Sequence, residues 1–480
     1  MARRFEPRTV AELGHWHHDT DVAVVGLGCA GAAAALEAVA AGADVTVLER
    51  ASGGGGTSSM SGGVIYLGGG TALQKACGFE DSPEEMYRYL MAACGDLPDE
   101  PKIRLYCEHS IEHYEWFVGH DVPFKAVFYP HYSGEPPTDD GLVFSGTEDA
   151  YPYNEVARPA PRGHVPQTPN QTGWLLMQKL VEAIERTPAT VLTDTRCLTL
   201  VLDDDGAVVG LVAKRDGEEY CIRARKGVVL TTGGFINNKD MLDAYAPLLR
   251  KCNFRVGAEG DDGSGIRMGM GAGAAAINMA MGSISLPITP PKTLIKGILV
   301  NAQGQRFVNE DAYFGVLGEH VLYRQEGKAY LVLDGETFQP PDVEREVAGV
   351  GETVEEIEGA LRLPAGSLKA TLELYNRHAE RGEDPVYHKA ADYVVPLAPP
   401  YGAFDCTTAN SLFAAFTLGG LRTSVDGEVL TADREPIAGL YAAGRASACI
   451  AAPRYASGIS IGDGTFFGRR AGRHAARGNA

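Results

Sequence analysis

The sequence predicts an α/β protein in which a doubly wound, largely parallel sheet domain is interrupted by a smaller α+β domain. Three observations support this. A strand–turn–helix–strand pattern stands near the N-terminus, residues 266–396 differ in character from the rest and contain helical stretches, and residues 397–480 return to strand–turn–helix patterns. We therefore expect residues 1–265 and 397–480 to form the first domain, and residues 266–396 to cap it.

The composition is that of an ordinary globular protein. The chain has 480 residues and a formal net charge of −19, which argues against a nucleic-acid partner. Nine cysteines include no C-x-x-C pair, so we expect a reduced, cytoplasmic compartment and no zinc site. The apolar run Val22 to Leu48 is broken by glycines, Glu37 and Asp44, so we expect no membrane span.

The histidines near the N-terminus and an aspartate run were considered as metal sites. His15, His17 and His18 have no nearby carboxylate or cysteine pattern, so we expect a solvated lead-in segment. Asp203 to Gly206 is predicted to be a hairpin turn, because no further ligands follow at calcium-loop spacing. We expect no bound metal.

The first domain opens with a βαβ unit. Asp21 to Val25 is predicted to be a buried strand, Ala30 to Ala41 a helix, and Asp44 to Glu49 the returning strand. We also expect helical structure at 82–119, an irregular surface segment at 128–170, and a β-meander from Thr190 that ends in the buried strand Gly227 to Leu230. Ile461 to Ala471 is predicted to be the last helix.

A dinucleotide-binding motif stands between the first strand and the first helix. Gly26 to Gly31 reads G-x-G-x-x-G, in which Gly26 permits a tight turn, Gly28 lets a pyrophosphate approach, and Gly31 lets helix and strand pack closely. Glu49 ends the second strand, where a carboxylate can accept hydrogen bonds from a ribose diol. The pattern predicts a Rossmann-like domain with the phosphates at the helix N-terminus.

Further glycine-rich segments favour FAD over NAD. Gly53 to Ser59 and Ser61 to Gly63 extend the site beyond the acid, as a flavin requires and a nicotinamide does not. Thr232 to Gly234 follows a buried strand, and Gly439 to Gly444 precedes Ser457 to Ser460. The helix that begins there can stabilise negative charge on a reduced flavin.

These motifs, with Thr417-Leu418-Gly419-Gly420-Leu421, resemble the fumarate reductase/succinate dehydrogenase flavoprotein superfamily over nearly the whole chain. The resemblance implies an FAD domain interrupted by a capping domain. Members with covalent flavin carry a histidine before the glycine pair, and residues 57–61 contain none, so we expect non-covalent FAD. The residues expected to bind FAD are Gly26, Gly28, Ala30, Gly31, Glu49, Arg50, Gly56, Thr57, Ser58, Ser61, Gly62, Gly63, Gly233, Gly234, Asp262, Gly444, Ser457, Gly458, Ser460 and Ile461.

The substrate clamps of the dicarboxylate-reducing members are missing. Phe416 stands where those enzymes have a histidine, and Tyr313 and Phe314 occupy the place of their proton-donating arginine. Arg454 can align with their last clamp arginine, but one arginine is not enough to bind a dicarboxylate. Aromatic residues at these places suit a flat, apolar molecule.

The chain is more similar to the ketosteroid dehydrogenase branch, and within it to the 3-ketosteroid Δ4-(5α)-dehydrogenases. The match lies in Glu310 to Tyr313, Phe416 to Gly420 and Tyr455 to Gly458. By analogy Tyr313, Tyr455 and Ser457 are the catalytic residues. We assign Tyr455 with Ser457 to removal of the α-proton and Tyr313 to the ketone or to support of the base, although the two roles can be exchanged.

Alternative functions remain open at this stage. The chain could be a 3-ketosteroid 1-dehydrogenase or a fumarate reductase-like reductase of a small unsaturated acid, or a flavin fold without redox chemistry. A ketosteroid substrate and an unidentified electron acceptor are the expected partners. The direction of the reaction, the steroid side chain and the oligomeric state are not predicted.

Overall fold

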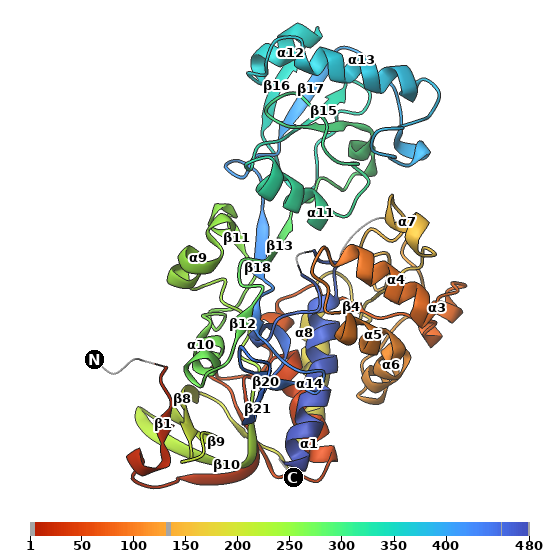
Figure 1. The fold of residues 1–480 in the computed structure, drawn as a ribbon. Coiled ribbons are helices and arrows are strands. Elements are labelled where there is room, and N and C mark those ends of the chain that lie inside the picture. Colours follow the sequence, from red (N-terminus) through yellow and green to blue (C-terminus); the bar gives the residue numbers. More distant parts are fainter. Residues whose placement is uncertain (1–4, 131–135, 453, 479–480) are drawn as a thin grey trace.

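The fold contains a nine-stranded sheet, which lies in the lower part of Figure 1. The computed structural model describes residues 5–130, 136–452 and 454–478. The strand order is β1-β8-β9-β10-β2-β3-β7, and β21 pairs with both β10 and β20. The strands are β1 (Arg8–Thr9), β2 (His18–Val25), β3 (Val45–Leu48), β7 (Thr190–Leu192), β8 (Arg196–Leu202), β9 (Val208–Arg215), β10 (Glu218–Leu230), β20 (Glu428–Leu430) and β21 (Pro436–Ala442).

Strand β10 belongs to two parts of this sheet. Its first half, Glu218 to Arg223, pairs antiparallel with β9, and its end, Val228 to Leu230, pairs parallel with β21. The register shifts between Ala224 and Gly227, where the strand passes from one part to the other. The predicted meander and the predicted buried strand are therefore present, and the last strand of the meander continues into the buried strand as β10.

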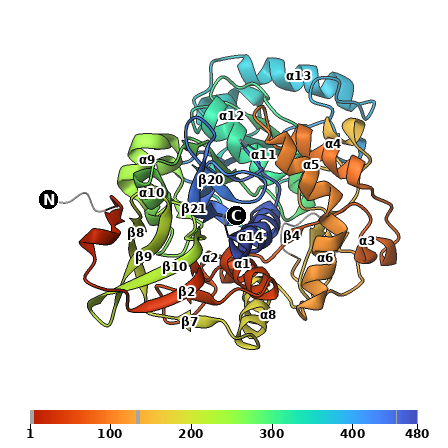
Figure 2. The ribbon, with the colours of Figure 1, turned by 60° about the horizontal axis from the view of Figure 1, so that its bottom comes forward.

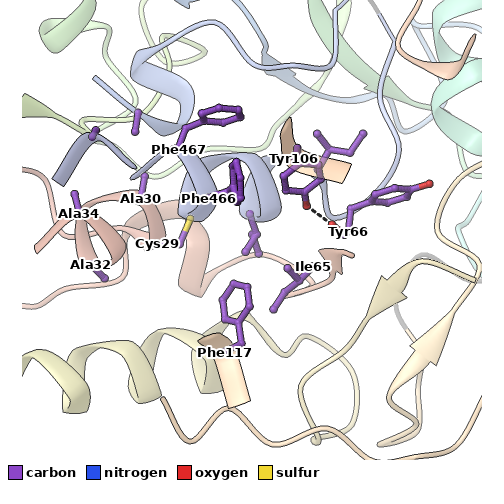
Figure 3. Packing of buried hydrophobic residues seen from close by; sticks show 14 of the residues in the cluster. Cys29, Ala30, Ala32, Ala34, Ile65, Tyr66, Tyr106, Phe117, Phe466 and Phe467 are labelled. Carbon is purple, nitrogen blue, oxygen red and sulfur yellow. Dashed lines mark hydrogen bonds between the residues drawn. The ribbon is translucent and has the colours of Figure 1, made fainter. Parts of the chain in front are cut away.

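Two helices cross the parallel part of the sheet. Helix α1 (Cys29–Ala40) lies beside α14 (Ile459–Arg477), as Figures 2 and 3 show. A Cβ on Gly468 would lie 2.5 Å from the Ala30 carbonyl oxygen, and one on Gly472 would lie 2.0 Å from that of Ala34. The helices therefore touch through their backbones, which is why alanine and glycine fill this contact.

The segment predicted to be helical at 82–119 forms three helices. These are α4 (Pro83–Ala93), α5 (Glu100–Glu108) and α6 (Ser110–Gly119). The hydroxyl of Ser82 caps α4 by accepting the Glu85 N–H, and the carboxylate of Asp99 caps α5 by accepting the Lys102 N–H. A second capping residue inside the segment is the reason one continuous helix does not form.

Short elements fill the rest of the lower part of the molecule. The segment 128–170 is irregular apart from α7 and the strands β5 and β6, which form a small sheet with β4. The expectation of a surface segment is wrong for residues 141–148 and 160–166, which are mostly buried, and residues 131–135 lie outside the described residues. The remaining elements are α2 (Gly56–Ser59), β4 (Ile65–Tyr66), α3 (Ala72–Ala76), β5 (Leu142–Val143), α7 (Tyr153–Val156), β6 (Gly163–His164), α8 (Gly173–Glu185), α9 (Lys239–Tyr245), β11 (Phe254–Arg255), α10 (Ser264–Gly271), β12 (Ala276–Ile277) and β19 (Gly420–Leu421).

A second sheet lies at the top of Figure 1. Residues 286–413, which contain this sheet, are called the cap. Its order is β14-β15-β17-β16, and α12 and α13 pack against it. Strands β13 (Gly282–Ser285) and β18 (Ala414–Thr417) pair with each other and lead into and out of it. The cap contains β14 (Ile298–Val300), α11 (Phe314–Glu319), β15 (Tyr330–Asp334), β16 (Val347–Gly351), α12 (Val354–Ala360), α13 (Ser367–Ala379) and β17 (Tyr401–Asp405).

The arrangement is the predicted α/β domain with an inserted second unit. Strand β17 pairs with β15, so the second sheet extends beyond residue 396, where the sequence suggests that the insertion ends. The boundaries at 265/266 and 396/397 stay a prediction. No helix in the described part of the chain has both the length and the apolar character needed to cross a membrane.

Candidate active site

The glycine-rich turn after β2 is held by close backbone contacts. Gly26 has a φ of +102°, in the region that favours glycine, and a Cβ on Gly31 would lie 1.9 Å from the Gly26 carbonyl oxygen. Gly28 is the N-cap of α1, and Ala30 stands in its first turn. Gly28 provides no side-chain cap for α1, and the motif predicts that a pyrophosphate binds at this N-terminus.

Glu49 lies where the second strand ends, and its carboxylate is fixed from both sides. One oxygen accepts the Leu27 N–H at 2.8 Å, and the other accepts the Ala51 N–H at 2.9 Å. Each oxygen keeps a second lone pair for a ribose hydroxyl. Next to it, the guanidinium of Arg50 lies 3.1 Å from the carboxylate of Asp262, so these two predicted cofactor residues are joined to each other.

The loop at 56–63 is tied to α1 through serine hydroxyls. Gly56 and Thr57 open α2, and the Ser58 hydroxyl accepts the Cys29 N–H at 3.2 Å. The Ser61 hydroxyl donates to the Ser58 carbonyl at 2.7 Å and accepts the Gly63 N–H at 3.2 Å. The Gly62 carbonyl in turn accepts the Thr172 hydroxyl at 2.9 Å. The loop predicted to follow the cofactor is thus held against the N-terminus of α1.

Asp261 is a residue of this site that the sequence analysis missed. Its carboxylate accepts the Thr57 hydroxyl at 2.7 Å and a guanidinium N–H of Arg445 at 2.7 Å. A Cβ on Gly233, which has a φ of +76°, would lie 1.9 Å from the same carboxylate, so the strand end at Gly233 and Gly234 passes directly over it. Asp261 and Asp262 are adjacent in the sequence, and nothing there shows which one reaches the loop.

The last part of the predicted cofactor site is the start of α14. Gly458 is its N-cap, with a φ of +97°, and Ser460 and Ile461 stand in its first turn. The Gly458 carbonyl accepts the Tyr66 N–H at 3.1 Å. Figure 3 shows Tyr66 near this end of α14, with its carbonyl accepting the hydroxyl of Tyr106. Gly444, with a φ of +63°, opposes Ala30 of α1.

These contacts test whether the residues fit FAD. The site combines two helix N-termini, a fixed carboxylate at the end of β3 and a loop in which glycines replace side chains. Such a combination suits a ligand with a ribose, a pyrophosphate and a ring that gains negative charge on reduction. The residues therefore fit the cofactor. In residues 5–130, 136–452 and 454–478, no three His, Cys, Asp or Glu side chains gather into a group suited to a metal.

Two of the three predicted catalytic residues meet. Tyr313 is the N-cap of α11 in the cap, and Ser457 directly precedes the N-cap of α14. Their hydroxyl oxygens lie 2.7 Å apart, and the ring of Tyr313 is 2% exposed. The cap and the first domain thus each supply one hydroxyl to a single hydrogen bond.

Tyr455 stands apart from this pair. Its hydroxyl oxygen accepts the Ser460 N–H at 3.1 Å, and its ring packs edge-on against Phe416 with 5.1 Å between centroids. Burial raises the pKa of Tyr455 to about 12, and the hydrogen bonds from Ser460 oppose that increase. The expected pairing of Tyr455 with Ser457 is not the one observed, since Ser457 pairs with Tyr313.

Arg454, which could have served as a carboxylate clamp, already has partners. Its guanidinium lies 3.2 Å from the carboxylate of Glu319 on α11 and 3.4 Å from the hydroxyl of Tyr153. Because the Glu319 side chain is 8% exposed, this ion pair is largely shielded from water. The positive charge of Arg454 is therefore compensated within the protein.

Comparisons with known proteins agree with this geometry. Residues 21–460 match the family described as FAD binding domain. The 3-oxo-5-alpha-steroid 4-dehydrogenase of Comamonas testosteroni is 30% identical, over 90% of this chain and 94% of its own length. The urocanate reductase of Eggerthella lenta is 28% identical, over 95% of this chain and 75% of its own length.

Among solved structures, 3-ketosteroid-delta4-(5alpha)-dehydrogenase from Rhodococcus jostii RHA1, in complex with 4-androstene-3,17-dione, superposes with a TM-score of 0.94. It is 47% identical and covers 98% of this chain and 99% of its own. The open conformation of a flavocytochrome c3 fumarate reductase superposes with a TM-score of 0.66 at 25% identity, covering 96% of this chain and 79% of its own. The chain belongs to the FAD-binding flavoprotein family of fumarate reductase and succinate dehydrogenase.

Proposed function

We propose that this chain is an FAD-dependent 3-ketosteroid dehydrogenase that introduces a 4,5 double bond into a 3-keto-5α-steroid. The observation that carries the proposal is the 2.7 Å hydrogen bond between Tyr313 of the cap and Ser457 beside α14. It involves the uncharged hydroxyl of Tyr313, which stands where the acid-reducing relatives have a cationic arginine. The enzymes from Comamonas testosteroni and Rhodococcus jostii, whose names describe this reaction, support it.

The surroundings of the pair suit a neutral, flat substrate. Phe416 and Tyr455 offer aromatic faces, and the charge of Arg454 is compensated by Glu319. A dicarboxylate would need unpaired cations, whereas a ketosteroid needs apolar walls and a few hydrogen-bond donors. These features favour the steroid over a small unsaturated acid.

Removing hydrogen beside a ketone requires loss of a proton from the α-carbon and of a hydride from the β-carbon. FAD supplies the hydride acceptor when bound. The protein's residues have to take the proton and stabilise charge on the ketone oxygen. Tyr455 is suited to the proton, because the Ser460 N–H stabilises its phenolate form, and the linked hydroxyls of Tyr313 and Ser457 can donate to the ketone.

The mode of cofactor binding belongs to the same proposal. We infer that FAD is held non-covalently, since residues 57–61 contain no histidine to link to it. The predicted cofactor residues hold it through backbone N–H groups and the Glu49 carboxylate. We also propose that the inserted segment, predicted at residues 266–396 and continued by β17, acts as a capping domain and contributes Tyr313 to the site.

The test is to mix the purified holoprotein anaerobically with a saturated 5α-3-ketosteroid and follow the flavin absorbance. We expect the flavin band to bleach and the product to carry a 4,5 double bond by NMR. A 1,2 double bond would instead assign the 3-ketosteroid 1-dehydrogenase reaction. No bleaching with any ketosteroid, together with reoxidation of chemically reduced flavin by fumarate, would overturn the steroid assignment.

A further inference from the structure

A buried turn, residues 145–148, contacts both sides of the proposed catalytic pair. The Ser145 carbonyl accepts the Ser457 N–H at 2.9 Å. Two residues on, the Thr147 hydroxyl oxygen accepts the Tyr313 N–H at 3.3 Å. One turn therefore holds the backbone of the serine from the first domain and the backbone of the tyrosine from the cap.

The side chain of Glu148, which is 1% exposed, holds this turn in place. One carboxylate oxygen accepts the Gly146 N–H at 2.8 Å, which closes the turn, and the other accepts the Tyr66 hydroxyl at 3.1 Å. The Tyr66 N–H donates to the carbonyl of Gly458, the neighbour of Ser457. Glu148 is thus connected to the catalytic serine by two routes.

The turn has little freedom to move. A Cβ on Gly146 would lie 2.2 Å from the Tyr89 hydroxyl and 3.0 Å from the Ala456 Cβ, so the turn packs directly against the segment that carries Ser457. The hydroxyl oxygen of Tyr89 also accepts the Thr147 N–H at 2.9 Å. A change at Glu148 is therefore expected to reach the catalytic hydroxyls rather than to be absorbed by a loose loop.

We propose that Glu148 is a positioning residue which, through the turn 145–148 and through Tyr66, holds the hydroxyls of Tyr313 and Ser457 together in the orientation the reaction requires. The inference rests on the proposed function. It adds a buried carboxylate whose hydrogen bonds go to Gly146 and Tyr66, and whose ionised form accepts both at once. A neutral carboxyl group carries a proton on one oxygen and accepts there less well.

The surroundings place this change of form near neutral pH. Burial raises the pKa of Glu148 to about 7, while the guanidinium of Arg162 opposes the increase. The charged and titratable groups that face Glu148 are Tyr66 from β4, Tyr89 from α4, the neighbouring Asp149, and the buried Arg162 with its partner Asp81. Ionisation of Glu148 on raising the pH should therefore improve the alignment of the pair.

The first test is Glu148→Gln, with reduction of the flavin in the holoprotein by the 5α-3-ketosteroid measured on both sides of neutral pH. We expect the wild-type rate to rise with pH through about 7. In Glu148→Gln that rise should be absent, and the rate at alkaline pH should be lower by about tenfold to a hundredfold. Glu155→Gln, on an exposed carboxylate of α7, is the matched control and should behave as wild type.

Stability separates positioning from a purely structural role. The ordinary pKa of a glutamate is 4.5, and that of Glu148 in the folded protein is about 7. At a pH between these two values, Glu148 is ionised in the unfolded chain but keeps its proton in the folded one, so stability falls as pH rises through that range. Glu148→Gln should remove this cost and be at least as stable as wild type at alkaline pH, although it is slower. If the variant loses stability and rate together, or keeps the wild-type pH profile, the inference is overturned.

A second pair of variants tests the same turn without changing Glu148. Thr147→Val removes the acceptor for the Tyr313 N–H, whereas Thr147→Ser keeps it. We expect Thr147→Val to slow flavin reduction and Thr147→Ser to keep the wild-type rate, with the FAD content unchanged in both variants. Equal rates in the two variants would contradict the inference. If the wild type itself is not reduced by ketosteroid, the proposed function fails and the positioning role falls with it.

Discussion

The two sides of the candidate site depend on different parts of the chain's chemistry. On the cofactor side, backbone atoms lie so close together that Gly31 and Gly233 leave no room for a side chain. On the cap side, the site is formed by contacts between side chains. The Tyr313–Ser457 hydrogen bond joins two residues that are 144 apart in the sequence, and the Arg454–Glu319 ion pair joins two that are 135 apart. A site built from backbone fails when atoms are added, and a site built from side chains fails when polar atoms are removed.

The largest effect is expected on the cofactor side. In Gly31→Ala, the new Cβ would lie 1.9 Å from the Gly26 carbonyl oxygen, so the turn that approaches the pyrophosphate has to open. We expect the dissociation constant for FAD, measured by absorbance titration, to rise by about tenfold or more, equivalent to about 1.4 kcal/mol of binding free energy. Gly359→Ala, in α12 of the cap, is the control, since a Cβ there meets nothing within 4 Å. Full FAD content in Gly31→Ala would show that the turn is not held as described.

On the cap side, removal of either hydroxyl should stop chemistry while the protein stays yellow. We expect Tyr313→Phe and Ser457→Ala to slow flavin reduction by the steroid by about 100-fold to 1,000-fold, because stabilisation of charge on the ketone oxygen depends on these hydroxyls. FAD content should not change. Tyr245→Phe, on a residue that is 37% exposed, is the control in stopped-flow measurements. If the two variants lose FAD but keep their rate of flavin reduction, the pair serves the cofactor and not the substrate.

A smaller effect is expected at the ion pair between the cap and the first domain. Glu319→Gln leaves the Arg454 guanidinium without its carboxylate in a largely buried place. We expect a loss of roughly 2 kcal/mol in unfolding free energy, below the range for fully buried pairs because Arg454 is one-fifth exposed. Carboxylate inhibitors such as fumarate should also bind more tightly.

Arg324→Gln provides the comparison for that variant, measured by denaturant unfolding. Arg324 is 51% exposed and lies 3.9 Å from the same carboxylate, so its removal should change stability much less. If the two variants are equally stable, the Arg454–Glu319 pair contributes no more than an exposed contact.

The last prediction concerns the pH dependence of stability, through Asp463 inside α14. Burial raises the pKa of Asp463 to about 7, and the nearby Lys102 opposes the increase. At a pH between the ordinary pKa of 3.8 and about 7, Asp463 has lost its proton in the unfolded chain but keeps it in the folded chain. Stability should therefore fall as pH rises through this range. The slope from this group is at most about 1.4 kcal/mol per pH unit. Asp463→Asn should reduce the slope in urea unfolding at several pH values, and an unchanged slope would contradict the assignment.

The same contrast explains which parts of the molecule could be predicted from the sequence. The βαβ unit, the Gly26–Gly31 turn and the final helix follow from short stretches whose residues contact one another, and the structure confirms these elements. The three helices at 82–119 were missed as separate elements because Asp99 acts as a cap only where the chain turns.

The contacts of the catalytic residues required the fold. Sequence similarity predicted catalytic roles for Tyr313, Tyr455 and Ser457, but not that Ser457 pairs with Tyr313 and Tyr455 with the Ser460 N–H. Glu148 carried no pattern at all, since its partners Tyr66 and Gly146 belong to no motif. Polar pairs between distant segments depend on how the cap is placed, and composition does not record that placement.

The central claim is tested most directly by the position from which hydrogen is lost. Flavin reduction would be followed anaerobically with 5α-3-ketosteroids that carry deuterium either at carbons 4 and 5 or at carbons 1 and 2. The account predicts slower bleaching only with the 4,5-labelled steroid, and one deuterium lost from each of those carbons in the product. Slower bleaching only with the 1,2-labelled steroid would contradict it and assign the neighbouring bond to this site.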